Sequence, residues 1–206
     1  MLKPGRQRGF NIIEVVTTIA VLGILIATAM PSMTDWIKAT HVRNMAETTQ
    51  AGLQRARTEA MKRNRIVTFW LVSPNTTTSP DDTCAQAADS AAWVVSLDDP
   101  AGKCDVAPSA TVAPRIIEIH GPGKNALGIT VAGKDGAGDA ATSVSFNGYG
   151  QTVGAKPLVN IEIEHSDTSQ RKLRVEISAS GSIRMCDPAV DQAGVPKDAR
   201  ACNNPV

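Results

Sequence analysis

The chain has 206 residues, and its 21 basic and 20 acidic side chains give a formal net charge of +1. This even balance excludes a general, charge-driven affinity for nucleic acids, which requires a clear excess of Lys and Arg. Aromatic residues make up 3% of the chain, so a folded core must consist mainly of Ile, Val and Leu.

The first thirty-one residues combine a basic stub with an apolar run. Three basic residues lie within residues 1–9, and residues 15–30 are mostly apolar, with Pro31 after them. Glu14 lies inside this apolar region, where a carboxylate at bilayer depth costs about 2.5–3.5 kcal/mol. No Ala-x-Ala-like cleavage site follows the run, which argues against an ordinary secretory signal. A cut after Gly9 would instead leave the stub in the cytoplasm and retain the apolar helix.

The junction Gly9-Phe10, with Glu14 five residues into the remaining chain, resembles the type III signal of type IV pilins and type II secretion pseudopilins. The resemblance implies that prepilin peptidase cuts after Gly9 and that Phe10 becomes the N-methylated first residue. It also implies that Glu14 meets the terminal amine of a neighbouring subunit during assembly, and that Pro31 ends the assembly segment. Asn11 stands where the family usually has threonine. Without the stub, 21 − 3 = 18 basic residues would face 20 acidic ones, a formal charge of −2.

A plain single-span membrane anchor is the alternative. The basic stub fits the cytoplasmic side of such an anchor by the positive-inside rule. Residues 15–30 would span about 24 Å, less than the hydrocarbon core of about 30 Å. A helix that is marginal in lipid suits a subunit that later leaves the membrane for a filament.

A helical period continues beyond Pro31, and it predicts one helix from about residue 10 to Arg63. We expect a bend at Pro31 and a soft point at Gly52. At 1.5 Å per residue this helix would be about 80 Å long, so its second half should pack on a head domain. The apolar positions that recur at three- and four-residue steps or their multiples are Met33, Ile37, Met45, Leu53, Ala56 and Ala60.

The rest of the chain is predicted to be β structure. The predicted fold class is therefore α+β: a long N-terminal α-helix packed on an antiparallel β-sandwich-like head of the type IV pilin kind. We expect residues 1–9 to be a prepilin leader, 10–35 a hydrophobic helix for membrane and assembly, and 36–206 a periplasmic or extracellular head. The predicted strands are 66–72, 93–97, 115–119, 128–131, 143–146, 160–165, 172–177 and 182–185.

Four cysteines lie in polar surroundings without any C-x-x-C spacing, which argues against zinc and thioredoxin-like sites. Two disulfides formed in an oxidising compartment are the better interpretation, with free thiols in a cytosolic protein as the alternative. Three connectivities are open. The local pairs Cys84–Cys104 and Cys186–Cys202 are favoured because each closes a short, turn-rich loop, and each would stabilise the fold by about 3 kcal/mol.

Two segments of the head indicate which branch of the pilins and pseudopilins the chain resembles. Residues 146–150, Phe-Asn-Gly-Tyr-Gly, and 180–188, which begin Ser-Gly-Ser-Ile-Arg, look like those of minor type IV pilins of the FimU/FimT type. These pilins share their head domain with the H-type pseudopilin of type II secretion. The segment 73–114 matches nothing in that pattern. The cysteine-bearing tail favours the pilus branch over the secretion branch.

A DNA-binding branch of the same family carries a Gly-Arg-x-Arg motif near the C-terminus. Here Gly181 is followed by Ser182, so the first arginine of the motif is missing. Phosphate contacts by the remaining cations alone would give weak, salt-sensitive binding. A solvated, charged hairpin is the favoured interpretation. The candidate DNA contacts are Arg171, Lys172, Arg174 and Arg184.

The sequence offers little support for catalysis. The histidines His41, His120 and His165 are scattered, without metal-ligand spacing. Residues 121–124 lack the spacing of a phosphate loop, and 135–139 have too few acids for a calcium loop. We therefore expect no catalytic residues, no metal and no cofactor.

The predicted function is that of a minor type IV pilin, a low-copy subunit that primes pilus assembly or lies in the tip complex. The expected partners are other minor and major pilins, prepilin peptidase and, before assembly, the inner membrane; the mature subunit would lie in a surface pilus. The alternatives are an H-type pseudopilin, a DNA-binding minor pilin for natural transformation, and a membrane-anchored exported domain without an assembly role.

Overall fold

The chain divides into two compact units, Met1–Ile37 and Lys38–Val206, in the computed structural model. None of the described helical segments is both long enough and apolar enough to cross a membrane. The structure describes residues 9, 11–73, 79–123, 126, 128–167, 169–190 and 198–203, without the side chains of 28–32.

A single helix, α1 (Ile12–Arg63), contributes to both units, and it confirms the predicted long helix. Asn11 caps its start, because the backbone N–H of Glu14 donates to the Asn11 carbonyl at 3.0 Å and the Asn11 side chain faces the N–H of Ile13. The helix continues through Pro31. It ends at Arg63, and the next residue, Asn64, has a φ of 49°, the left-handed conformation that commonly terminates helices.

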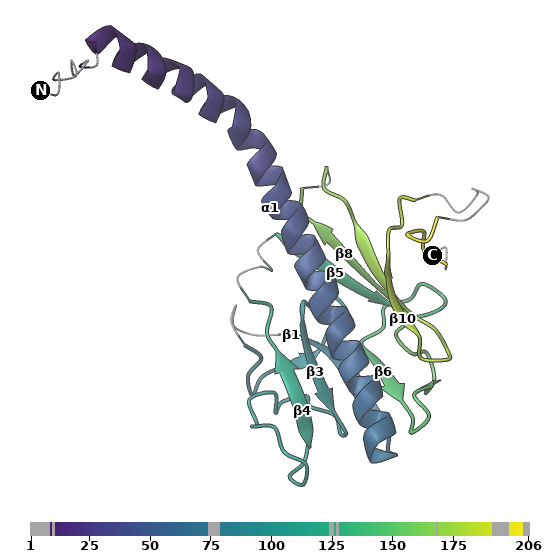
Figure 1. Ribbon diagram of the computed structural model, residues 1–206. Coiled ribbons are helices and arrows are strands. Elements are labelled where there is room, and N and C mark those ends of the chain that lie inside the picture. The colour runs from purple at the N-terminus through teal and green to yellow at the C-terminus, as the bar shows by residue number, and fades with distance from the viewer. Residues whose placement is uncertain are drawn as a thin grey trace, which may run out of the picture. The chain divides into compact units, whose positions relative to one another are not determined.

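The part of α1 in the second unit buries one apolar stripe at three- and four-residue steps. Four of its members are predicted core residues, whereas Met33 and Ile37 are exposed in the first unit. Figure 1 shows this part of the helix lying against the sheets of the head. The buried apolar residues of the stripe are Val42, Met45, Ala46, Leu53, Ala56 and Ala60.

Gly52 is not a soft point in α1, so that prediction is wrong. The residue is buried, and a Cβ placed on it would lie 2.8 Å from the indole ring of Trp93. Trp93 packs there between the helix and Phe69, whose ring centroid lies 5.5 Å away. Glycine is therefore used at this position for close approach, and its cost in helix propensity is offset by aromatic packing.

The larger sheet has six antiparallel strands in the order β4-β3-β1-β6-β7, with β2 paired to β1. Its central strand β1 is almost wholly buried, as its run of Val, Phe, Trp and Leu predicts. Two of its strands, β2 and β7, were not predicted. The strands are β1 (Val67–Ser73), β2 (Ala85–Gln86), β3 (Ala92–Ser96), β4 (Ile116–His120), β6 (Ser143–Phe146) and β7 (Thr152–Val153).

The smaller sheet has four antiparallel strands in the order β10-β9-β8-β5. Its apolar residues alternate with charged ones, so one face joins the core and the other carries charge. The strands are β5 (Ile129–Lys134), β8 (Asn160–His165), β9 (Leu173–Ile177) and β10 (Ile183–Cys186).

The main core lies where α1 and both sheets meet, and it consists mainly of Ile, Val, Leu and Ala with three large aromatic residues, Phe69, Trp93 and Phe146. A second, smaller cluster includes Val72, Val94 and Ile116, together with the disulfide Cys84–Cys104. The residue just before β2 and the loop after β3 are therefore joined covalently over buried apolar side chains. The second disulfide, Cys186–Cys202, joins the end of β10 to the C-terminal tail.

Candidate functional site

Of the two residues at the predicted cleavage junction, the structure describes Gly9. Gly9 is exposed, and a Cβ placed on it would meet nothing within 4 Å. Phe10, the predicted methylated terminus, lies outside the described residues. The cut after Gly9 therefore stays a prediction.

Glu14 is exposed in the first turn of α1, where a negative charge complements the helix dipole. It is the only charged residue between Asn11 and Thr34. The hydroxyls of Thr17 and Thr18 donate to the carbonyls of Glu14 and Val15, at 3.0 and 2.8 Å, so these polar groups are satisfied within the helix. The described residues supply no ion pair or hydrogen bond to the Glu14 carboxylate.

Apolar side chains surround this carboxylate on every side of the helix. Ten large apolar residues between Ile12 and Ile26 are 43–82% exposed. A helix that is apolar all round is normally buried in a membrane or in protein. Pro31 lies within α1, its side chain is outside the described set, and its role in assembly stays a prediction.

The four cations predicted as DNA contacts all lie on β9, β10 and the turn before β9, and each forms an ion pair with a different acid. The Arg174–Glu162 pair spans 2.7 Å and the Arg184–Glu176 pair 3.0 Å. The structure thus brings the four together but neutralises each one. The other two pairs are Arg171–Asp187 and Lys172–Glu164.

Strand register produces two of these pairs. Glu162 lies directly opposite Arg174 across β8 and β9, and Glu176 lies directly opposite Arg184 across β9 and β10. Opposite charges at facing positions stabilise an antiparallel pair. Burial alone would raise the pKa of Glu162, but hydrogen bonds from Lys134 and Arg174 outweigh it and hold the pKa below its usual range.

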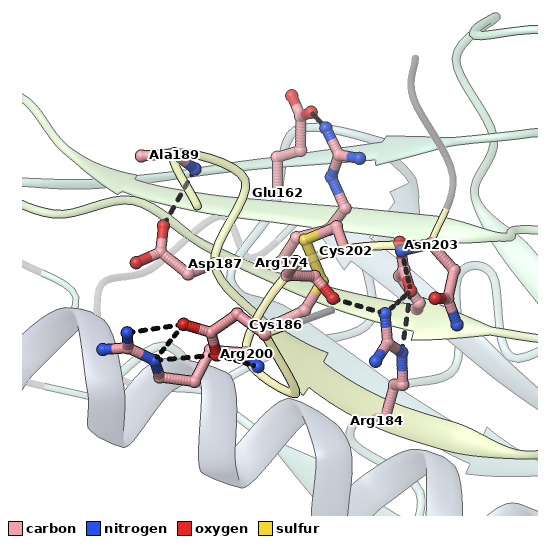
Figure 2. The surroundings of a disulfide bond; sticks show 12 residues. Glu162, Arg174, Arg184, Cys186, Asp187, Ala189, Arg200, Cys202 and Asn203 are labelled. Carbon is pink, nitrogen blue, oxygen red and sulfur yellow. Dashed lines mark hydrogen bonds and ion pairs between the residues drawn. A yellow bond between two sulfur atoms is a disulfide. The ribbon is translucent and has the colours of Figure 1, made fainter. Parts of the chain in front are cut away.

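The C-terminal tail covers this charged face beside the Cys186–Cys202 disulfide (Figure 2). Arg184 donates to the carbonyl of Ala201 at 2.7 Å, and the Glu176 carboxylate accepts the N–H of Asn203 at 3.1 Å. Glu176 and the two cysteines lie close enough to hold a metal ion. Because both sulfurs are joined in the disulfide, the cluster lacks the thiolates that a metal would need.

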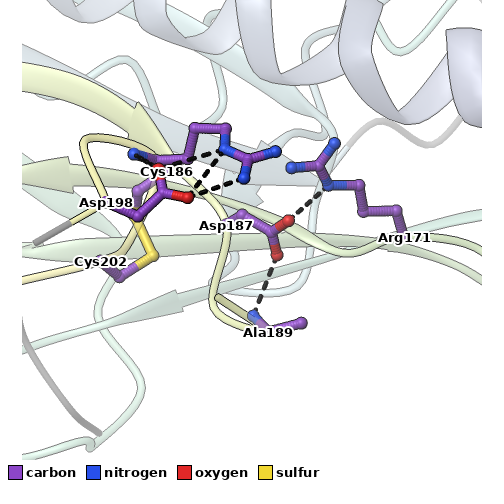
Figure 3. Close-up of polar contacts among 7 residues, drawn as sticks. Arg171, Cys186, Asp187, Ala189, Asp198 and Cys202 are labelled. Carbon is purple, nitrogen blue, oxygen red and sulfur yellow. Dashed lines mark hydrogen bonds and ion pairs between the residues drawn. A yellow bond between two sulfur atoms is a disulfide. The ribbon is translucent and has the colours of Figure 1, made fainter. Parts of the chain in front are cut away.

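A second set of contacts fixes the tail on its other side (Figure 3). Asp187 pairs with Arg171 and accepts the N–H of Ala189 at 2.9 Å. Asp198 pairs with Arg200 at 2.7 Å, and hydrogen bonds from Arg200 lower the pKa of Asp198 to about 2. The tail is thus held by a disulfide, by backbone hydrogen bonds and by paired charges.

The sequence model of the family described as type II transport protein GspH matches residues 45–181, about two thirds of the chain. The chain belongs to the GspH family. Two crystal structures of the type IV minor pilin FimU from Pseudomonas aeruginosa (strain PAO1) are similar to it at 18% identity. One covers 71% of this chain and 88% of its own, with a TM-score of 0.44; the other covers 69% and 90%, with a TM-score of 0.43. No curated protein matches the chain.

The GspH match extends from the middle of α1 through β9, so the pairs Lys172–Glu164 and Arg174–Glu162 lie inside it. Asp187, the partner of Arg171, lies beyond it. The match also includes the first disulfide. β10, the Cys186–Cys202 disulfide and the tail that they hold lie beyond the matched residues.

His120, His165 and the 135–139 turn of this GspH-family chain have structural roles. His120 stacks on Trp93 with ring centroids 4.9 Å apart, and burial lowers the pKa of His120 while nearby Glu118 opposes the shift. His165 Nδ1 accepts the N–H of Asp167 at 2.9 Å. Asp135 is buried, and its Oδ1 accepts two backbone N–H groups of the 135–139 turn, as a turn-closing Asp does.

The sequence did not predict two groups of paired charges, one around Glu59 and one between Lys38 and Asp167. Glu59 is 3% exposed and lies among three cations of α1, and the hydrogen bond from Arg63 lowers the pKa of Glu59 while burial opposes it. Its i, i+3 and i, i+4 spacing to Lys62 and Arg63 is a signal that sequence could have supplied. Lys38 and Asp167 pair at 2.7 Å across 129 positions, for which no local signal exists.

Proposed function

We propose that the chain is a minor type IV pilin, a low-copy filament subunit that primes pilus assembly or lies in the tip complex. The observation that carries the proposal is the first part of α1, which exposes apolar side chains on every side and has a single carboxylate in its first turn. This segment precedes a head with a GspH match. Such a helix requires lipid before assembly and the helices of other subunits after it.

In this proposal Glu14 fixes how one subunit is aligned with the next along the filament. A carboxylate among apolar side chains is costly unless it is paired, and breaking such a buried pair costs about 3–5 kcal/mol. The terminal amine of Phe10 in a neighbouring subunit would be its partner. The Thr17 and Thr18 hydroxyls donate to backbone carbonyls of their own helix. The Glu14 carboxylate is therefore the group that selects the position of the next subunit.

The remaining assignments follow from this role. Residues 1–9 are the leader removed by prepilin peptidase, and residues 10–35 hold the chain in the inner membrane and then contact other minor and major pilins. Residues 36–206 form a head that lies in the periplasm and later at the cell surface. The chain acts through assembly and not through catalysis, and it uses no cofactor.

Mass spectrometry of the mature protein from pilus-forming cells tests this proposal. We expect the chain to begin at N-methylated Phe10, and we expect Gly9→Val to remain uncut because a branched side chain obstructs the peptidase. Gly23→Val is the matched control, since Gly23 also has open space around it, and it should be cut normally. A mature chain that begins after Pro31 would exclude a pilin role.

An H-type pseudopilin of type II secretion is the second candidate, and the description of the matching family favours it. Deletion of the gene separates the two candidates, because loss of pili supports the first and loss of secreted folded proteins supports the second. A dedicated DNA receptor has less support, since all four candidate cations are paired with acids.

A further inference from the structure

The segment Phe146–Gly150 forms a tight turn whose tip is Tyr149, the only tyrosine of the chain. The Asn147 side chain accepts the N–H groups of Tyr149 and Gln151, each at 3.0 Å, and the N–H of Asn147 donates to the Gln151 carbonyl at 3.0 Å. Gly150 completes the turn with a φ of 75°. The Tyr149 side chain is nevertheless 84% exposed. A well-fixed turn therefore presents a large aromatic ring to the surroundings.

This turn packs against the end of α1. A Cβ on Gly148 would lie 2.2 Å from the Asn64 side chain, and a Cβ on Gly150 would lie 2.9 Å from the Met61 sulfur. Arg57 fastens the turn by donating from Nε to the Gly150 carbonyl at 3.1 Å. Met61 is itself 41% exposed. Tyr149 thus stands beside other exposed apolar groups instead of being isolated.

We call this region the tip surface and define it by Arg57, Met61, Arg65, Ile66 and Tyr149. Ile66 belongs to it because the next residue, Val67, pairs with Phe146 across β1 and β6, and Ile66 is 55% exposed.

The tip surface lies in a positively charged part of the head. Residues 54–65 carry five cations and one acid, and that acid, Glu59, is buried beneath the surface. Glu118 pairs with Arg55 at 3.8 Å. Asp98 lies near Arg65 but is paired with Arg115, so the region keeps a net positive charge. The five cations are Arg55, Arg57, Lys62, Arg63 and Arg65.

We infer that the tip surface docks an acidic, apolar-centred face on the head of a neighbouring pilin subunit, with Tyr149 as the central anchor. This inference rests on the proposed function. Tyr, Met and Arg are the residue types that concentrate at protein interfaces, and exposed Tyr and Arg are frequent hot spots. Charge complementarity specifies that the partner face is acidic.

A protein partner fits the surface better than a nucleic acid does. The cations surround the carbonyl end of α1, whose partial negative charge opposes a phosphate at that point. Single-stranded nucleic acids need successive aromatic platforms, and the tip surface offers one ring. A folded partner could hold the phenol of Tyr149 in a pocket and place acidic groups at the rim of that pocket, opposite the cations.

The test measures binding of the processed full-length chain, in detergent, to each pilin encoded beside its gene. We expect Tyr149→Ala and Arg65→Glu each to weaken binding of one such pilin by about tenfold or more. Because the Tyr149 side chain is exposed and the turn is held by Asn147 and Arg57, removal of the ring leaves the fold intact. Val112→Ala is the matched control, since Val112 is 61% exposed outside the tip surface, and it should bind within twofold of the wild type.

Tyr149→Ala that binds every pilin as tightly as the wild type overturns the inference, as does the absence of any binding pilin. Binding of duplex DNA or anionic vesicles that Tyr149→Ala abolishes also overturns it, because the partner is then of another class. These outcomes differ from failure of the proposed function, which would appear as an uncut chain and unchanged pili after deletion of the gene.

Discussion

Trp93 and Gly52 show how a single residue decides a packing distance in this fold. The indole lies so close to α1 that even one methyl group at Gly52 would approach it to 2.8 Å. Glycine within a helix is normally a defect that alanine repairs by about 1 kcal/mol. At this position steric overlap opposes the gain in helix propensity, and overlap of that size in a packed core outweighs it.

We therefore predict that Gly52→Ala destabilises the head by about 1–3 kcal/mol, measured as the free energy of unfolding in urea. The control is Gly136→Ala, where a Cβ meets nothing within 4 Å, and it should change stability by less than about 0.5 kcal/mol. A stabilised Gly52→Ala variant would show that Trp93 moves aside at no cost.

Asp198 gives a prediction for pH. Its folded-state pKa of about 2 lies below the ordinary value of 3.8, so the stability that its contacts with Arg200 give to the tail's local structure is complete above about pH 4 and is lost as the pH falls towards 2. Carboxyl NMR titration should give the low pKa in the wild type. In Arg200→Gln the pKa should rise towards 3.8, because the largest cause of the shift is the hydrogen bond from Arg200. Equal values in the two proteins would contradict this.

At the scale of elements, the hairpin arms of the smaller sheet were predictable and their charge pairing was not. Alternating apolar and polar residues identified 160–165 with the observed bounds, and 172–177 with a start one residue before that of β9. Register is fixed by three-dimensional pairing, so nothing local indicated that Arg174 would face Glu162. β2 and β7 escaped prediction because two residues cannot display a period of two.

The charge pairing of the hairpin makes a prediction about DNA. Full-length chain in detergent should bind duplex DNA weakly or not at all at physiological salt, because each candidate cation already has an acidic partner. Changing all four cations to glutamine should leave transformation unaffected as long as pili form. Sub-micromolar binding that Arg184→Gln removes would instead make DNA uptake the leading function.

The two disulfides close loops of similar length but in different surroundings. Cys84 and Cys104 lie in an apolar cluster with Val72 and Val94, whereas Cys186–Cys202 holds the tail on a charged face. Loop closure alone predicts about 3 kcal/mol for each. We expect the double variant Cys84→Ser/Cys104→Ser to cost more than Cys186→Ser/Cys202→Ser in urea unfolding, because its hydroxyls are buried among apolar side chains. A larger loss from the second pair would contradict this.

At the scale of the whole molecule, the two compact units differ in how their apolar side chains are satisfied. The head buries its own in one main core and one smaller cluster, whereas the described side chains of 11–27 stay exposed. The sequence indicated this division through its apolar run and its strands. The tip surface was not predicted, because exposure of Tyr149 depends on the packing of its turn against α1.

We propose that the first part of α1 is an assembly segment in which Glu14 selects the position of the neighbouring subunit. The most direct measurement is the amount of Glu14→Val protein in sheared pili, compared with its amount in the inner membrane. Insertion should be unimpaired, since an acid has been removed from an apolar helix. Thr17→Val is the control, because that hydroxyl is bonded within the helix, and it should enter pili normally. We predict a large loss of Glu14→Val from pili, and wild-type incorporation of this variant would contradict the assembly role of Glu14.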